Sequence, residues 1–295
     1  MLKKITQYVI NLLARFVFFL NKVLTLILPQ SHENFLREKL IEKNDSIFKT
    51  IVHRNQKKEI RFNLYTPNFM CSMRANSFSS KEPETLEWIE EFGGSGTFFD
   101  IGANIGIYSI YYAKYHKGKV YSFEPSAFNL KQLAKNISIN KLEDRIHIIP
   151  NPLSNKTSFE NFKNLNDTEG GALSAFGVDY GFDGNLIKKE WEYNLLGFSL
   201  DYLIDIDVIK DLPSMIKIDV DGIEHLILEG AMKTLKKAEC RSVSIEVNYD
   251  FIEQYSETKR ILENCGFKLS HTKHSDMFED EGNSSKSYNQ LWVKE

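Results

Sequence analysis

The chain has 295 residues, of which 42% are hydrophobic and 26% charged, and its formal net charge is −3. This composition is ordinary for a globular protein with a large core in one or two domains, and a near-neutral chain without a long basic block is not expected to bind nucleic acid. Three widely spaced cysteines without a C-x-x-C pair predict neither a disulfide framework nor a zinc site, and they favour a reducing, cytoplasmic location.

Residues 1–30 are predicted to form a segment of their own, an apolar helix with one polar stripe. Residues 5–28 are strongly apolar, but polar residues recur in and just before this run at spacings of three, four and seven: Lys4, Gln7, Asn11, Arg15, Lys22 and Thr25. This pattern predicts an interfacial amphipathic helix that contacts the inner face of the membrane. Packing against this or another subunit, a spanning helix and a signal peptide stay open as alternatives. Arg15 near the centre disfavours a span, and the lack of a small-residue cleavage site before Pro29 disfavours a signal peptide.

Residues 31–92 are predicted to form an extension that precedes the main domain. Residues 31–42 suit a polar helix or linker, and the β-leaning runs 47–53 and 59–65 predict a hairpin. Residues 67–80 are predicted to be irregular, either covering a ligand site or simply connecting two elements. Pro83 at a first turn predicts a helix that ends at Gly93 and Gly94.

The main domain, residues 93–295, begins with a predicted strand, glycine turn and helix. The apolar run 97–101 contains Asp100 and leads through Gly102 and Gly106 into a helical segment, and a second apolar strand ends at Glu124. Such a βαβ unit places both carboxylates and the glycine turn at the carboxyl ends of neighbouring parallel strands. That edge of an open α/β sheet is where nucleotides bind.

The residues at this edge favour a positively charged nucleotide. A dinucleotide site needs G-x-G-x-x-G, whereas only Gly102-x-x-x-Gly106 is present, and Asp100 would repel a pyrophosphate. S-adenosylmethionine (SAM) carries an ammonium, a sulfonium and a ribose diol that can donate hydrogen bonds to Glu124. We therefore predict that SAM is bound by Asp100, Gly102, Asn104, Gly106 and Glu124. An NAD(P)-dependent oxidoreductase is the first alternative.

Three segments resemble the FkbM-type SAM-dependent methyltransferases: DIGANIG at 100–106, FEP at 123–125 and IKIDVDGIE at 216–224. The resemblance covers roughly residues 82–295. It implies a class I Rossmann-like α/β fold, whose seven-stranded, mostly parallel sheet ends in a C-terminal antiparallel hairpin. It also implies O-methylation of a hydroxyl group on a sugar, glycan or natural product. A non-catalytic binding module is the second alternative, although the acids Asp100, Glu124 and Asp219 are all present.

The third of these segments carries charges on a predicted central strand, 215–220, where apolar residues are the rule. Lys217, Asp219 and Asp221 alternate with apolar residues, so they lie on one side of the strand. Asp221 and Glu224 suit either a substrate role or a capping box for a helix over 223–237. Capping cannot explain Lys217 and Asp219, because both precede the helix, and we assign them to the site.

The catalytic assignment combines three residues at this edge. Glu246 lies near the end of the next predicted strand, 241–247, and either faces the site or pairs with Lys217. We expect Asp219 to act as a base or to orient the acceptor, with Lys217 and Glu246 setting its charge state.

The remaining segments predict elements around this centre. They are a helix at 127–139, a strand at 145–149, loops with short strands at 156–194, a helix at 251–265 and a final hairpin of 267–272 with 288–294. His271, His274, Asp276 and Glu279 lie in or beside a polar connection without a helical frame, so no metal site is expected.

Overall fold

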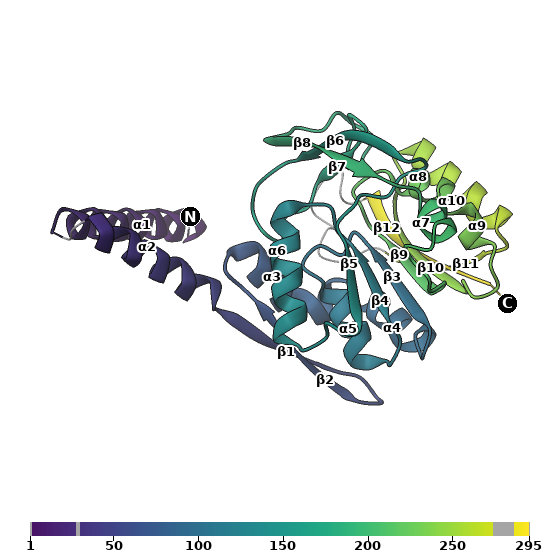
Figure 1. The fold of residues 1–295 in the computed structure, drawn as a ribbon, viewed down its shortest axis with the longest axis horizontal. Helices are drawn as coiled ribbons and strands as arrows, with labels where there is room; N and C mark the ends of the chain where they lie inside the picture. The colour runs from purple at the N-terminus through teal and green to yellow at the C-terminus, as the bar shows by residue number, and fades with distance from the viewer. Residues whose placement is uncertain (1, 28–29, 274–285, 295) are drawn as a thin grey trace. The chain divides into compact units, whose positions relative to one another are not determined.

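The computed structural model describes residues 2–27, 30–273 and 286–294 and separates the chain into two compact units, residues 1–47 and 48–295 (Figure 1). Each unit is described by itself. The smaller unit contains the helices α1 (Leu2–Ile27) and α2 (Gln30–Asp45). The predicted N-terminal helix is thus present. No helix in the described part of the chain combines the length and apolarity that crossing a membrane requires.

The two faces of α1 differ as the sequence predicts. Between residues 8 and 27 the apolar face exposes large side chains to solvent, among them Val9, Leu13, Phe16, Leu20 and Ile27. The helix contains four basic residues and no acidic residue. By contrast, α2 is mainly polar.

A seven-stranded sheet forms the centre of the larger unit, in the order β11-β12-β10-β9-β3-β4-β5. Five neighbouring strands are parallel: β10 (Ser242–Asn248), β9 (Pro213–Ile218), β3 (Thr97–Ile101), β4 (Val120–Phe123) and β5 (Ile146–Ile149). The last strand, β12 (Ser287–Val293), is antiparallel to both β10 and β11 (Lys268–Lys273). This arrangement confirms the predicted sheet and its C-terminal antiparallel hairpin.

Helices cover both faces of the sheet, which divides the core into two clusters. Phe98 and Phe99 are both fully buried but belong to different clusters, because successive side chains of a strand point to opposite faces. The cluster of Phe98 includes residues of α3 (Phe69–Lys81), α4 (Pro83–Phe92), α5 (Ile107–Tyr115) and α6 (Ala127–Ile139). The cluster of Phe99 includes residues of α7 (Leu200–Asp205), α8 (Glu224–Glu229), α9 (Met232–Leu235) and α10 (Ile252–Asn264). The three cysteines are free and buried.

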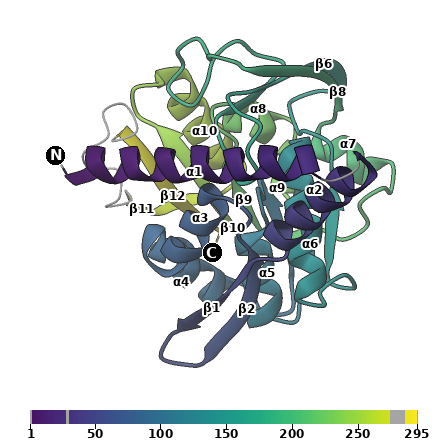
Figure 2. The ribbon, with the colours of Figure 1, turned by 90° about the vertical axis from the view of Figure 1, so that its left-hand side faces the viewer.

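The predicted hairpin is present as β1 (Phe48–Arg54) and β2 (Glu59–Tyr65), which lies beside α5 and α6 (Figure 2). The prediction that 67–80 is irregular was wrong, since these residues form α3. The side chain of Asn68 accepts a hydrogen bond from the backbone N–H of Cys71 and caps the helix. Phe78 of α3 then packs edge-on against Phe62 and Tyr111, so tertiary packing stabilises a helix whose sequence is only weakly amphipathic.

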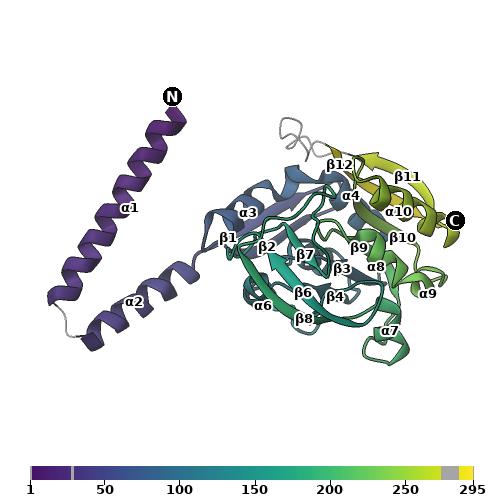
Figure 3. The ribbon, with the colours of Figure 1, turned by 90° about the horizontal axis from the view of Figure 1, so that it is seen from above.

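Residues 156–197 consist mainly of loops with short strands, as predicted, and these strands form a small antiparallel sheet. Its strands are β6 (Ser158–Asn164), β7 (Ser174–Phe176) and β8 (Trp191–Gly197), in the order β7-β6-β8 (Figure 3). Phe162 and Phe176 are buried in the same cluster as Phe99. This insertion therefore belongs to the core and lies near the carboxyl ends of the parallel strands.

The helix predicted over 223–237 is divided into α8 and α9. At Gly230 a Cβ would lie 2.1 Å from the carbonyl oxygen of Ser154, so the chain packs there too closely for a side chain. The carboxylate of Asp201 caps the second piece, accepting hydrogen bonds from the backbone N–H groups of Lys233 and Thr234, both at 2.8 Å. A residue distant in sequence thus provides the cap.

We predict that Asp201→Ala lowers the free energy of unfolding by about 1–2 kcal/mol, because two N–H groups of a helix terminus lose their acceptor. The measurement is the midpoint of urea denaturation. Asp205→Ala is the matched control, since Asp205 contacts only the exposed ammonium of Lys233. An equal effect of both substitutions would contradict this role of Asp201.

Candidate active site

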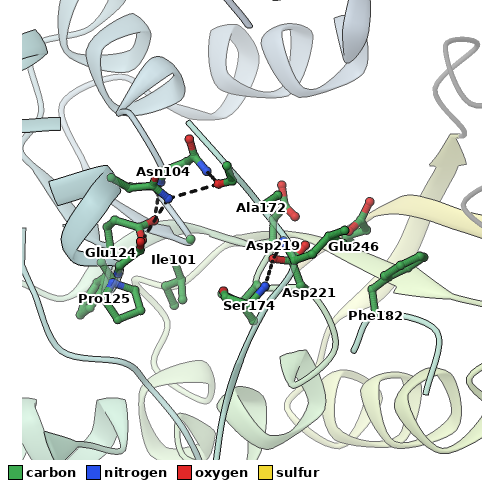
Figure 4. A pocket seen from close by; sticks show the side chains of 18 of the residues that line it. Ile101, Asn104, Glu124, Pro125, Ala172, Ser174, Phe182, Asp219, Asp221 and Glu246 are labelled. Atoms are coloured by element: carbon green, nitrogen blue, oxygen red, sulfur yellow. Dashed lines mark hydrogen bonds between the residues drawn. The ribbon is translucent and has the colours of Figure 1, made fainter. Parts of the chain in front are cut away.

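A cavity of about 500 Å³ opens at the carboxyl ends of β3, β4, β9 and β10. Residues of α3 and of the insertion form its other walls. Figure 4 shows Glu124 and Asn104 toward one end and Glu246 and Phe182 toward the other, with Asp219 and Asp221 between them. The cavity is within the size range of small-molecule binding sites.

The glycine turn after β3 is built by a close backbone approach. Gly102 has φ +86°, and a Cβ on it would lie 1.9 Å from the carbonyl oxygen of Asp219. Gly106 has φ +85° and precedes α5, so the chain can enter the helix in a conformation that other residues rarely adopt. Gly102 and Asn104 line the cavity, whereas Gly106 lies outside its wall.

Glu124, at the end of β4, faces the same cavity. Its carboxylate accepts hydrogen bonds from the backbone N–H groups of Asn104 at 2.7 Å and Ser126 at 2.8 Å. Burial raises the pKa of Glu124 to about 7, although these hydrogen bonds oppose the shift. Glu124 is therefore a fixed carboxylate next to the glycine turn.

Asp100 is placed differently from the prediction of direct ligand contact. It is completely buried and does not line the cavity. The hydroxyl of Ser109 donates a hydrogen bond of 2.5 Å to it. Burial raises the pKa of Asp100, and the nearby Lys217 ammonium opposes this shift. The residue lies beneath the cavity and supports its floor.

Lys217 and Asp219 form an ion pair in the floor of the cavity, with 2.6 Å between Nζ and Oδ2. The Lys217 side chain is 3% exposed and that of Asp219 is 30% exposed, so the carboxylate is the partner that solvent can reach. Burial disfavours the Lys217 charge, but Asp219, Glu82 and Asp100 together raise the pKa of Lys217.

Glu246, on β10, also lines the cavity. Burial first, and then the negative charge of Asp219, raise the pKa of Glu246 well above its usual value. The described partner of the Lys217 ammonium is Asp219, so a Lys217–Glu246 pair does not explain Glu246. Lys217, Asp219 and Glu246 thus all line the same cavity.

Several charged residues of the N-terminal extension join this cluster, and sequence reasoning did not identify them. Glu82 is buried and accepts hydrogen bonds of 2.8 Å from both Lys81 Nζ and the Tyr108 hydroxyl. Burial opposes its ionisation, yet Lys81 and Lys217 hold the pKa of Glu82 at about 2. Because Glu82 directly precedes a proline that starts a helix, the sequence shows only a helix boundary there.

Asp221 and Glu224 hold backbone around the site. Asp221 has φ +65° and accepts hydrogen bonds from the N–H groups of Leu173 at 2.8 Å and Ser174 at 3.1 Å, and burial raises its pKa to about 6. The predicted capping box was wrong, because α8 begins at Glu224 with Ile223 as its N-cap residue. Glu224 instead accepts hydrogen bonds from residues of the turn before the helix. Asp221 lines the cavity and Glu224 does not.

Within residues 2–27, 30–273 and 286–294, no three His, Cys, Asp or Glu side chains gather as potential ligands of a metal ion. His274, Asp276 and Glu279 lie outside the described residues.

Comparison with known proteins gives one family match. A model of the methyltransferase FkbM domain matches residues 100–269. Among solved structures, similarity is found to an rRNA methylase from Streptococcus thermophilus (13% identity, 72% of this chain, 94% of that chain, TM-score 0.44). A second is the fibrillarin pre-rRNA processing protein of Methanococcus jannaschii (15% identity, 84% of this chain, 83% of that chain, TM-score 0.45). A third is TYW2 of M. jannaschii in complex with AdoMet (14% identity, 83% of this chain, 87% of that chain, TM-score 0.41). Identities this low, with TM-scores below 0.5, decide neither substrate nor partner.

We predict that Glu224 makes the protein less stable as the pH rises from 5 to 7. Burial raises its pKa from 4.5 to about 7. The folded state therefore binds a proton that the unfolded state has released, and this contribution to stability is complete below pH 4.5 and lost as the pH rises through 7. Glu224→Gln removes up to about 1.4 kcal/mol per pH unit of this slope.

Urea denaturation at a series of pH values measures the effect. Glu239→Gln, at an exposed position, is the matched control and keeps the wild-type slope. Parallel slopes for the wild type and Glu224→Gln would refute the assignment.

Proposed function

The chain belongs to the FkbM family of methyltransferases, and from this premise we propose that it transfers a methyl group from SAM to a hydroxyl group of a sugar, glycan or natural product. The single observation that carries the proposal is the polarity of the cavity. Glu124 and Asn104 stand toward one end and Glu246 toward the other, and Asp219, the partner of Lys217, lies between them beside the glycine turn. One continuous space thus offers a place for a cationic nucleotide and a place for a polar acceptor.

The residues present fit SAM. Gly102 lets the turn pack against the Asp219 carbonyl, which a Cβ would prevent, and Glu124 offers its carboxylate to the ribose hydroxyls. The backbone N–H of Asn104, which lines the same cavity, donates a hydrogen bond to Glu124. Asp100 and Gly106 lie outside the cavity wall, so in this proposal Gly106 shapes the turn and Asp100 supports it from below. When bound, SAM supplies a methyl group on a positively charged sulfur.

The acceptor end supplies the means to orient a hydroxyl group and to remove its proton. Asp219 can accept that proton, because its carboxylate is exposed to the cavity and fixed by Lys217. Lys217 stays charged and holds the Asp219 oxygen in place. Glu246, whose pKa is raised, retains its proton to higher pH and can donate a hydrogen bond to a second acceptor oxygen.

The carboxylates that line the cavity support methylation of an oxygen atom. A hydroxyl group must lose a proton on methylation, and carboxylates line the acceptor end of the cavity. Membership of a methyltransferase family sets aside the oxidoreductase alternative. The acids Glu124 and Asp219 both face the cavity, which also argues against a module that only binds a partner.

We predict that substitution of Glu124 impairs SAM binding, whereas substitution of Asp219 impairs turnover. Glu124→Gln weakens SAM binding at least about tenfold, because a charged hydrogen-bond acceptor is lost. Asp219→Asn retains SAM affinity within a few fold but lowers turnover by about 10²–10⁴-fold. Titration calorimetry measures binding, and conversion of SAM to S-adenosylhomocysteine with a panel of hydroxyl acceptors measures turnover.

Glu143→Gln, at an exposed position, is the control for both measurements. Wild-type SAM affinity in Glu124→Gln, or wild-type turnover in Asp219→Asn, would refute the corresponding assignment. Absence of SAM binding by the wild-type protein would refute the function itself.

We further infer that α1 binds the surface of an anionic membrane. Its apolar face exposes Leu13, Phe16 and Leu20, which suit insertion at the boundary between headgroups and acyl chains. The helix has four basic residues and no acid, and each Lys or Arg near an anionic surface contributes about 1 kcal/mol. Charge complementarity therefore favours a lipid surface over a neutral protein groove.

Flotation of the full-length protein with phosphatidylcholine vesicles, with and without phosphatidylserine, tests this inference. We expect flotation that increases with phosphatidylserine and is lost in the double variant Phe16→Asp, Leu20→Asp. The matched control is Leu40→Asp, Ile41→Asp, which changes two exposed apolar residues of α2. No flotation of the wild type, or a concentration-dependent dimer that only the α1 variant disrupts, would contradict membrane binding.

A further inference from the structure

Three cationic side chains line the cavity: Arg74, Lys81 and Lys217. Lys81 and Lys217 each have a carboxylate partner, Glu82 at 2.8 Å and Asp219 at 2.6 Å. In the described part of the chain, no carboxylate oxygen lies within 4.0 Å of the Arg74 guanidinium. Arg74 is therefore the cavity cation whose charge the protein does not neutralise by a direct ion pair.

The guanidinium of Arg74 is held in place by the backbone. Its Nε–H donates a hydrogen bond of 2.7 Å to the carbonyl oxygen of Gly170. This contact uses one of its five N–H donors and leaves the two terminal amino groups, which match the two oxygens of a carboxylate. A fixed guanidinium of this kind binds a planar anion without first losing side-chain freedom.

Arg74 lies close to the glycine turn of the cofactor site. The carbonyl of Gly171, next to the one that holds Arg74, accepts a hydrogen bond of 2.6 Å from the Asn104 side chain. Burial raises the pKa of both Asp221 and Tyr108, and the positive charge of Arg74 partly opposes this rise, so Arg74 is within electrostatic reach of the end of β9 and the first turn of α5. The guanidinium is thus positioned beside the turn that surrounds the cofactor.

From this position we propose that Arg74 binds the α-carboxylate of the methionine portion of SAM; the inference rests on the proposed function. SAM carries two positive groups and one carboxylate. Acids of the site suit the positive groups, and Arg74 is the cavity cation that remains for the carboxylate. A partly buried charge without a partner is costly, and the ligand would neutralise it. Arg74 belongs to α3, outside the residues 100–269 that match the family model.

An acidic acceptor could supply the same carboxylate chemistry, and ligand choice separates the two sources. S-adenosylhomocysteine contains the amino-acid carboxylate, whereas 5′-methylthioadenosine lacks the amino-acid portion and shares the nucleoside. Titration calorimetry with both ligands requires neither turnover nor knowledge of the acceptor. The variants are Arg74→Ala, Arg74→Lys and the matched control Ser77→Ala, another cavity-lining residue of α3.

We expect Arg74→Ala to weaken S-adenosylhomocysteine binding about tenfold or more and to leave 5′-methylthioadenosine binding unchanged. Arg74→Lys should recover part of the affinity, and Ser77→Ala should behave as wild type. Thermal unfolding of each variant reports whether the fold is intact.

Unchanged S-adenosylhomocysteine affinity in Arg74→Ala would overturn the proposal. The guanidinium would then be available to bind the carboxylate of an acidic acceptor instead. An equal loss of both ligands would also overturn the proposal, because Arg74 would then act only by holding the loop at Gly170. If the wild-type protein bound neither ligand, the proposed function itself would fail, and that result is distinct from failure of the Arg74 assignment alone.

Discussion

The site depends on one backbone contact at the centre of the sheet, between the turn after β3 and the end of β9. Gly102 approaches the Asp219 carbonyl so closely that a Cβ would lie 1.9 Å from its oxygen. The adjacent hydrogen bonds, from Asp219 N–H to the Ile101 carbonyl and from Gly102 N–H to the Phe123 carbonyl, are each 3.0 Å long. One glycine turn therefore joins the ends of β3, β4 and β9. Any side chain at position 102 would separate the residues expected to hold the cofactor from those expected to receive the acceptor.

Electrostatics imposes a second constraint on the same floor. The buried Lys217 ammonium lies near Asp219, Glu82 and Asp100, and each of these carboxylates raises the pKa of Lys217. Reciprocally, Lys217 helps to lower the pKa of Glu82 and opposes the effect of burial on Asp100. Without this cation the acids would stand together in a poorly solvated floor, where an uncompensated charge typically costs about 3–5 kcal/mol. Lys217 thus allows several carboxylates to remain near one another at neutral pH.

The sequence predicts those parts of the molecule that periodicity and turn chemistry determine. The alternating charges at Lys217 and Asp219, the acid at the end of β4 and the Gly102 turn all lie where the strand pattern places them. The sequence pattern does not predict secondary structure correctly where contacts between residues distant in sequence determine it. Residues 69–81 become helical through packing on the β1–β2 hairpin, and α8 ends where Gly230 meets the backbone of Ser154. The sequence of residues 67–80 is compatible either with covering a ligand site or with connecting two elements, and only the packing of α3 places Arg74 at the cavity. A two-residue period likewise does not predict the burial of Asp100.

The insertion between β5 and α7 is fastened to the turns that form the floor of the cavity. Asp221 and Leu173 both have positive φ, at +65° and +67°, and the Asp221 carboxylate accepts the N–H of Leu173. Strained backbone of this kind persists only where its surroundings fix it. A second contact, between Asn104 and the Gly171 carbonyl two residues earlier, fixes the same end of the loop. This end of the loop is thereby anchored to both the β3 turn and the β9 turn, so one wall of the cavity is held in place by the residues of its floor.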